Sequence, residues 1–144
     1  MTVSITTERE RVFQKLLDNI DSLDIEAILG LFTADAIYQD VPVEPEGTQG
    51  HDGIRFKFGV CFNELERLEM LPKTIDEVDG RVYSERLEIW HFKSGERVTL
   101  PVLCVVEFAD DDKIAHWREY WDRNTLYSQL PQSFIDYMSS LGGN

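Results

Sequence analysis

Two segments in the second half of the chain place charged and aromatic residues at every second position. Side chains two residues apart in a β-strand lie on the same face. In a strand over 81–92, one face would carry Ser84, Arg86, Glu88 and Trp90. In a strand over 113–122, one face would carry Ala115, Trp117, Glu119 and Trp121. If the faces with the tryptophans point inward, one arginine and two carboxylates enter the interior with them.

One arginine and two carboxylates in the interior could form ion pairs and act in acid–base catalysis. Buried charges are costly unless they pair, and the guanidinium of Arg86 has a fork of donors that could hold Glu88 and Glu119 together. Two carboxylates whose pKa values differ can act as general acid and general base at neutral pH. The same pattern also fits a solvent-exposed strand face, because charged residues are mostly exposed.

The first half of the chain shows apolar residues at helical spacing. Thr7-Glu8-Arg9-Glu10 has the form of a capping box, and the residues behind it predict a helix over 8–21. A second helix is expected over 25–32, with an apolar stripe that ends at Phe32. A strand is expected over 36–43, and a third helix over 52–69.

The second half changes to strand-like patterns. Four strands are expected, over 71–78, 81–92, 96–109 and 113–122. The residues between them are typical of tight turns and indicate an antiparallel meander: Asp79-Gly80, Lys93-Ser94-Gly95 and Asp110-Asp111-Asp112. The tail before Gly142-Gly143 has helical spacing and predicts a closing helix. We therefore predict an α+β fold, in which a curved, mostly antiparallel sheet carries the N-terminal helices on its concave face and encloses a pocket.

The length of the chain indicates the number of domains, and its net charge limits the classes of binding partner. A chain of 144 residues is expected to form one domain over 1–144. It has 14 basic and 27 acidic residues, a formal net charge of −13 and a pI near 4.5. Nucleic acid and an anionic membrane surface are excluded as expected partners, because both require basic patches. Apolar residues make up 42% of the chain, which is enough for a globular core.

The cellular compartment is also predicted from the sequence. The segment 1–11 is polar and charged and lacks the apolar run of a signal peptide. No apolar stretch approaches the ~20 residues of a membrane span. Cys61 and Cys104 have no metal or redox spacing and are expected to be buried thiols. We expect a cytoplasmic protein.

Four stretches of the chain together are similar to a known family. They are Tyr38-Gln39-Asp40-Val41-Pro42, Ser84-Glu85-Arg86-Leu87-Glu88, Leu100-Pro101-Val102 and Lys113-Ile114-Ala115-His116-Trp117-Arg118-Glu119-Tyr120-Trp121-Asp122. In this order they resemble the limonene-1,2-epoxide hydrolase family. The resemblance runs from about residue 8 to about residue 125. It implies the cone-shaped fold shared by nuclear transport factor 2, ketosteroid isomerase and polyketide cyclases, a fold that hosts many functions.

The resemblance implies roles for individual residues. In that family a tyrosine and an asparagine on the first strand, with a carboxylate on the last strand, hold and activate a water molecule. An arginine and a second carboxylate lie on a middle strand, and this carboxylate protonates the epoxide oxygen. Tyr38, Arg86 and Trp117 match the family pattern directly.

Three positions depart from the family pattern. Glu88 and Glu119 stand where the family has aspartates, and each glutamate reaches about an ångström further, a displacement that can change a rate greatly. Asp40 stands where the family has asparagine. An amide offers water a donor and an acceptor, whereas an ionised aspartate only accepts. Asp40 would also add a third negative charge, which one arginine cannot balance.

We predict from these residues an enzyme that adds water to a small apolar epoxide without a covalent intermediate. Glu119, beside Arg86 and Tyr38, is the expected base, and Glu88 is the expected acid. No cofactor is expected. No metal is expected either, because the fixed positive charge of Arg86 would compete with an ion for the carboxylates.

Two alternatives remain open. Asp40 also suits a proton-transfer enzyme of the ketosteroid-isomerase or polyketide-cyclase kind, whose base lies at the corresponding place; Leu16 and Cys104, however, stand where that isomerase has its oxyanion donors. The other alternative is a non-catalytic module that binds a small apolar ligand. The residues expected to line the substrate or ligand cavity are Trp90, Trp117, Phe56, Phe58 and Leu103.

A second copy of the chain is the other expected partner. The resemblance implies a homodimer. An apolar patch on the outer face of the sheet would suit its interface. The expected members of this patch are Leu87, Ile89, Leu103 and Val105.

Overall fold

The computed structural model describes residues 3–141, with helices first and most of the sheet after them. The first half contains α1 (Glu8–Asp21), α2 (Ile25–Leu29), β1 (Phe32–Asp40), β2 (Thr48–Gln49) and α3 (His51–Phe62). The second half contains β3 (Leu65–Pro72), β4 (Asp76–Val78), β5 (Arg81–Phe92), β6 (Arg97–Phe108), β7 (Ile114–Tyr120), α4 (Arg123–Tyr127) and α5 (Gln132–Ser140). Gly142-Gly143, expected to follow the last helix, lie outside the described residues, as do Met1 and Thr2.

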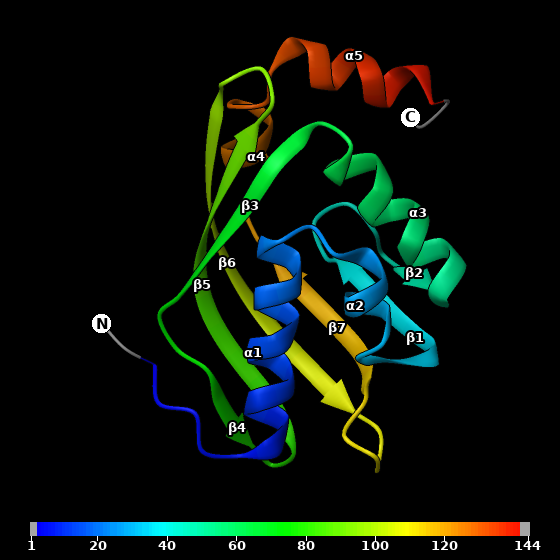
Figure 1. The fold of residues 1–144 in the computed structure, drawn as a ribbon, viewed down its shortest axis with the longest axis vertical. Helices are drawn as coiled ribbons and strands as arrows, with labels where there is room; N and C mark the ends of the chain where they lie inside the picture. The colour runs from blue at the N-terminus through cyan, green and yellow to red at the C-terminus, as the bar shows by residue number, and fades with distance from the viewer. Residues whose placement is uncertain (1–2, 142–144) are drawn as a thin grey trace.

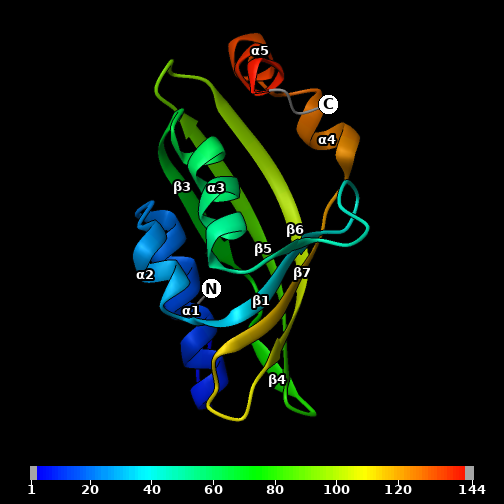
Figure 2. The same ribbon diagram turned by 90° about the vertical axis from the view of Figure 1, so that its right-hand side faces the viewer.

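The seven strands form one strongly curved sheet. Their order is β2-β1-β7-β6-β5-β3, and β4 pairs with β5. All pairs are antiparallel except β1 and β7, which are parallel. Helices α1, α2 and α3 lie on the concave side of this sheet (Figures 1 and 2). The predicted α+β architecture is therefore confirmed.

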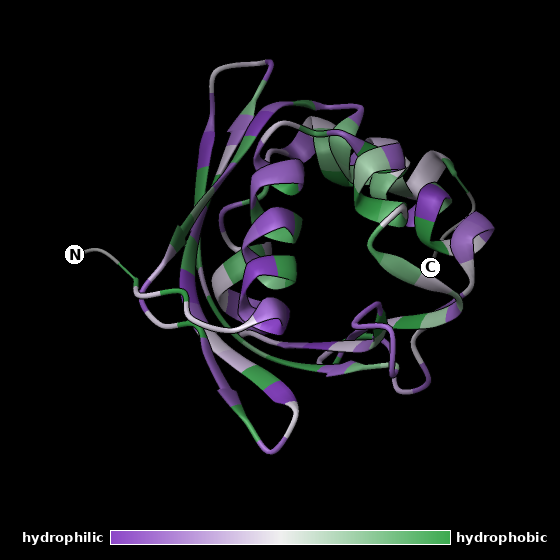
Figure 3. Ribbon diagram, turned by 60° about the horizontal axis from the view of Figure 1, so that its bottom comes forward, coloured by the Kyte–Doolittle hydropathy of each residue, from purple (hydrophilic) through white to green (hydrophobic). Residues whose placement is uncertain are grey.

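Helix α1 attaches to the sheet through one apolar face. The Thr7 side chain accepts a hydrogen bond from the Glu10 N–H, and the Glu10 carboxylate accepts one from the Thr7 N–H. The predicted capping box is therefore present. The buried residues of the helix are Glu10, Val12, Phe13, Leu16, Leu17 and Ile20. Figure 3 shows hydrophobic residues along one side of the N-terminal helix and hydrophilic residues along the other. Each large apolar side chain buried there stabilises the fold by about 1.5–3 kcal/mol.

The hairpin between β4 and β5 follows its turn residues. Val78 pairs with Arg81, so Asp79 and Gly80 form a two-residue loop. Both have positive φ, 52° and 81°, as a type I′ turn requires. The predicted turn at Asp79-Gly80 is confirmed.

The predicted helix over 52–69 is too long, and the predicted strand over 71–78 starts too late. The helix ends at Phe62, and β3 already begins at Leu65. The register of β3 shifts between Leu65 and Arg67, so the buried Leu65 and Leu68 are three residues apart. This bulge imitates the spacing of a helix. The strand pairing is set by β5, which lies far away in sequence.

Smaller differences have local causes. Phe32 was expected on the second helix but begins β1, where it pairs with Ile114 of β7. The predicted strand over 71–78 breaks because the N–H groups of Lys73 and Thr74 both donate to the Glu85 carbonyl. The sequence pattern did not indicate α4, which is capped by Asp122 through a 2.8 Å bond from the Thr125 N–H.

The described chain has two free thiols. Cys104 is fully buried and Cys61 is partly buried. Burial raises the pKa of both thiols, so they stay protonated at neutral pH. Within residues 3–141, none of the helices has the length and apolar character needed to cross a membrane.

Candidate active site

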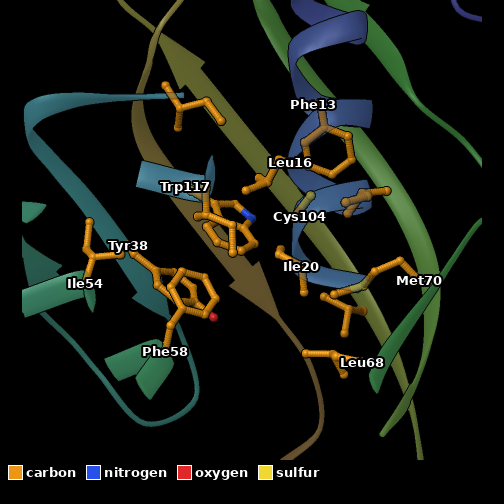
Figure 4. Close-up of a cluster of buried hydrophobic side chains, with 14 of the residues drawn as sticks. Phe13, Leu16, Ile20, Tyr38, Ile54, Phe58, Leu68, Met70, Cys104 and Trp117 are labelled. Atoms are coloured by element: carbon orange, nitrogen blue, oxygen red, sulfur yellow. The ribbon is translucent and has the colours of Figure 1, made fainter. Parts of the chain in front are cut away.

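A cavity of about 540 Å³ lies between the concave face of the sheet and the helices. Strands β1, β5 and β7 contribute all the lining residues that carry a negative charge except Glu44. Helices α3, α4 and α5 contribute mainly apolar lining. Figure 4 shows part of the apolar wall, with Tyr38, Phe58 and Trp117 on one side and Leu68 and Met70 on the other. The volume falls in the range of small-molecule sites, about 300–1,000 Å³.

Arg86 joins the two glutamates at the sheet side of the cavity. Its Nη1 donates to Glu119 Oε2 at 2.9 Å and its Nη2 donates to Glu119 Oε1 at 2.5 Å. Its Nε donates to Glu88 Oε2 at 3.1 Å, and its Nη2 donates to the same oxygen. Relative exposures are 1%, 5% and 3% for Arg86, Glu88 and Glu119. The guanidinium is thus a buried clamp between two carboxylates.

Strand geometry explains how these residues meet. Glu119 pairs with Cys104 of β6, while Arg86 pairs with Val102 of the same strand. Arg86 therefore reaches across β6 to Glu119. Burial acts to lower the Arg86 pKa, but the charges of Glu119 and Glu88 outweigh it and raise that pKa well above its ordinary value.

Glu119 has an unusual proton affinity for a carboxylate. Burial raises its pKa, Arg86 lowers it, and the negative charges of Glu88 and Asp40 raise it again. The net result is a pKa of about 7 instead of 4.5. A carboxyl group with this pKa takes up and releases a proton near neutral pH, which suits acid–base catalysis.

Asp40 contacts Trp121 and Lys57, and neither contact was predicted from the sequence. Trp121 Nε1 donates to Asp40 Oδ1 at 2.8 Å. Lys57 Nζ lies 2.8 Å from Asp40 Oδ2 and forms a second ion pair with Glu44. The third negative charge of the site is thus balanced by a cation from α3.

A signal for Lys57 is present in the sequence. The residue lies three positions after Ile54 and four positions before Cys61, so it falls on the apolar stripe of the predicted third helix. A lysine on such a face must find a partner in the interior. The stripe is defined by its apolar residues, so the apolar pattern alone does not identify Lys57.

Aromatic rings form the wall beside the charges. The Tyr38 and Trp117 rings stack with centroids 4.2 Å apart, and Phe58 stacks on Tyr38 at 5.2 Å. Lys57 Nζ lies 3.5 Å from the centroid of the Tyr38 ring. Burial raises the pKa of Tyr38, and the charges of Asp40 and Glu119 raise it further, so the hydroxyl keeps its proton.

The structure brings most of the predicted site residues to one cavity. The predicted residues that line it are Tyr38, Asp40, Arg86, Glu88, Glu119, Trp90, Trp117, Phe56 and Phe58. The parallel register of β1 and β7 pairs Asp40 with Glu119 and Tyr38 with Trp117. The structure gives the positions of these residues, and their chemical roles stay predictions.

The prediction that Leu103 lines the cavity is wrong. Leu100, Val102 and Cys104 are buried on β6 and face inward. Side chains alternate along a strand, so Leu103 faces outward, where it is 51% exposed and pairs with Tyr120. The inward residues of β6 that do line the cavity are Leu100 and Val102.

The fold of the chain is shared with known proteins. A SnoaL-like domain matches residues 13–117 of the chain. The chain belongs to the SnoaL-like domain family. This family lies within the nuclear transport factor 2-like superfamily, in agreement with the predicted cone-shaped fold.

Solved structures support the SnoaL-like fold. An LEH-like epoxide hydrolase from M. tuberculosis has a TM-score of 0.74 and 21% identity, covering 94% of this chain and 98% of that chain. An epoxide hydrolase/cyclase-like enzyme with a role in pyran ring formation in salinomycin has a TM-score of 0.72 and 17% identity, covering 82% and 93%. A hypothetical protein from Catenulispora acidiphila with a ketosteroid isomerase-like fold, in complex with trimethylamine, has a TM-score of 0.74 and 17% identity, covering 89% and 98%.

Proposed function

We propose that this SnoaL-like protein is an epoxide hydrolase that adds water to an apolar epoxide without a covalent intermediate. The observation that carries the proposal is the buried Arg86 clamp, which holds Glu88 and Glu119 side by side at the wall of a mainly apolar cavity. Epoxide opening by water needs one group that removes a proton and one that supplies a proton. Two carboxylates in one desolvated site can share these tasks.

Glu119 is the proposed base. With a pKa of about 7 it is substantially ionised at neutral pH. It removes a proton from water as the water oxygen bonds to one epoxide carbon. The C–O bond at that carbon breaks, and its electron pair stays on the epoxide oxygen.

Glu88 is the proposed acid. In the reactive form of the site, the proton shared by the two coupled carboxyl groups lies on Glu88. Glu88 gives this proton to the departing epoxide oxygen, so the product is a neutral diol. Glu119 now carries the proton taken from water, and transfer of one proton back to Glu88 restores the starting state. Trp90 Nε1 donates to Glu88 Oε1 at 2.9 Å, and Arg86 holds Oε2, which fixes the orientation of this carboxyl group.

Tyr38, Asp40 and Lys57 are proposed to hold the water. The β1–β7 register places Asp40 beside Glu119, and the protonated Tyr38 hydroxyl can donate to the water or accept from it. Lys57 adds N–H donors next to the Asp40 acceptor. The pair therefore presents a donor and an acceptor together, as an asparagine does with a single amide.

The proton-transfer alternative has less support from the geometry. Both oxygens of Asp40 are engaged, one by Trp121 and the other by Lys57. Leu16 and Cys104, which stand where the isomerase has its oxyanion donors, are fully buried in the core. These contacts tie Asp40 to two donors in the cavity wall, while each of its oxygens keeps a lone pair that can accept from the water.

We also propose that the outer face of the sheet pairs with a second copy of the chain. Leu103 and Tyr120 are exposed and adjacent there, and Tyr83 pairs with Val105 next to them. Leu103→Asp places a charge in this patch. We expect sedimentation equilibrium to show a dimer for the wild type and a monomer for the variant; a wild-type monomer at micromolar concentration contradicts this proposal.

Diol formation tests the catalytic proposal. Wild type, Glu119→Gln and Glu88→Gln are compared on limonene oxide, cyclohexene oxide and styrene oxide. We expect each substitution to lower kcat by about 10²–10⁴-fold, the usual contribution of a positioned acid or base. Glu107→Gln is the matched control, because Glu107 also pairs with an arginine, Arg118, but outside the cavity. Equal turnover in all variants, or no diol from folded wild type, contradicts the proposal.

A further inference from the structure

A second cavity lies next to the first, between α3 and the C-terminal helices. It has a volume of about 400 Å³. We call it the annexe; its lining residues are Phe56, Val60, Tyr127, Leu130, Ile135, Met138, Ser139 and Leu141. Five of them, Phe56, Val60, Tyr127, Leu130 and Met138, also line the first cavity. The two cavities therefore adjoin each other along these five side chains.

The two adjoining cavities differ in the polarity of their lining. The charged side chains that line the first cavity come from the sheet, the β1–β2 connection and α3. In the part of the chain that the structure describes, the annexe is lined without any charged residue. A ligand that spans both spaces meets the Arg86 clamp at one end and hydrocarbon and aromatic rings at the other.

The annexe leaves large apolar groups open to solvent. Phe56 is 67% exposed, and Tyr127 and Leu141 are also exposed. Phe134 anchors helix α5, because its ring packs against that of Phe92 with the centroids 5.3 Å apart. Helix α5 lies above α3 in the view of Figure 1. Contiguous apolar surface of this kind marks a binding site more often than plain surface. An apolar occupant would remove it from water.

We propose that the annexe binds the hydrocarbon tail of the substrate, so that the substrate is a long-chain epoxide with a neutral, apolar tail. This inference rests on the proposed function for the identity of the reacting group. The first cavity alone is large enough for a small epoxide, and the annexe adds room for a tail beyond it. The far end of the tail carries no charge, because the described residues that line the annexe include none that could form an ion pair with it.

The test measures binding rather than turnover. Terminal 1,2-alkanediols of 6 to 16 carbons resemble the product and do not react, so their affinities stand apart from any hydrolase activity. Isothermal titration calorimetry gives Kd for each length. We expect Kd to fall as the chain grows, by up to about fourfold for each methylene that enters the annexe. Affinity that does not change with chain length overturns the proposal.

A substitution that introduces a charge into the annexe tests whether the tail binds there. Ile135 lines the annexe and is not part of the first cavity, so Ile135→Asp should bring the Kd ratio of the 6-carbon and 14-carbon diols close to one. Ile135→Trp, which fills the annexe without a charge, should do the same and covers the case of a poorly folded Asp variant. Val78→Asp is the control, because Val78 is an exposed apolar residue of β4, far from α5 (Figure 1). A chain-length dependence that survives both Ile135 variants overturns the proposal.

The outcomes separate this inference from the proposed function. Chain-length dependence that both Ile135 variants remove supports the annexe even if no epoxide is hydrolysed, in which case the function is wrong and the tail site stands. Hydrolysis of small epoxides with no chain-length dependence leaves the function in place and removes the tail site.

Discussion

The proton on Glu119 should make the stability of this protein fall as the pH rises towards 8. The folded protein holds that proton with a pKa of about 7, whereas the ordinary pKa of an exposed glutamate is 4.5. Between these values the folded state keeps the proton and the unfolded chain has lost it. The stabilisation is therefore fully present below about pH 4.5 and is lost as the pH passes through 7.

The magnitude follows from the two pKa values. At about 1.4 kcal/mol for each pH unit, the difference corresponds to a contribution of about 3 kcal/mol in total. Between pH 5 and pH 8 the contribution of Glu119 changes by roughly 2–3 kcal/mol. Because Glu119 is almost fully buried, solvent screens this effect little. We expect Glu119→Gln, which cannot titrate, to reduce the pH dependence of the unfolding free energy by this amount.

Urea denaturation at pH 5 and pH 8 measures the effect. The unfolding free energy of wild type should fall between the two pH values by more than that of Glu119→Gln. Glu107→Gln serves as the control: the hydrogen bond from Arg118 lowers the Glu107 pKa, so Glu107 titrates below this window. If wild type and Glu119→Gln show the same difference between pH 5 and pH 8, the burial argument for Glu119 is wrong.

Three further predictions concern the same cluster. Arg86→Met removes the only arginine between two buried carboxylates and should lower the unfolding free energy at pH 8 by about 3–5 kcal/mol, as measured by urea denaturation; a loss below 1 kcal/mol contradicts the clamp. Lys57→Met should lower kcat because Asp40 loses its cation, and adding Asp40→Asn should restore part of the activity, so a double variant no better than Lys57→Met argues against the shared role. Trp90→Phe removes the donor to Glu88 Oε1 and should lower kcat by about tenfold or more while a diol still binds, whereas unchanged kcat would show that this bond does not position the acid.

The polar face of the sheet could be predicted because strands alternate. On β5 the buried positions Ser84, Arg86 and Glu88 follow period two. On β7 Trp117 and Glu119 do the same. The residues themselves indicated the turns and the capping box, since these depend on neighbours within a few positions.

Contacts that join distant parts of the chain could not be predicted in this way. The Lys57–Asp40 pair depends on how α3 sits over β1, and no local pattern sets that distance. The start of β3 at Leu65 depends on pairing with β5, which overrides helical spacing. The position of α5 over the cavity depends on contacts such as Phe134 with Phe92. Leu103 is different, because strict alternation with the inward Val102 was already enough to place it outside.

A single-turnover reaction in ¹⁸O-labelled water tests the central proposal most directly. Unlabelled enzyme in excess is mixed with an apolar epoxide, and the diol is analysed by mass spectrometry. If a water activated by Glu119 attacks the epoxide carbon itself, the diol of this first turnover carries one ¹⁸O atom, and Glu119→Gln forms little diol. If the first-turnover diol is unlabelled, its new oxygen came from a protein carboxylate. That result, or the absence of diol from folded wild type, contradicts direct hydrolysis at the Arg86 clamp.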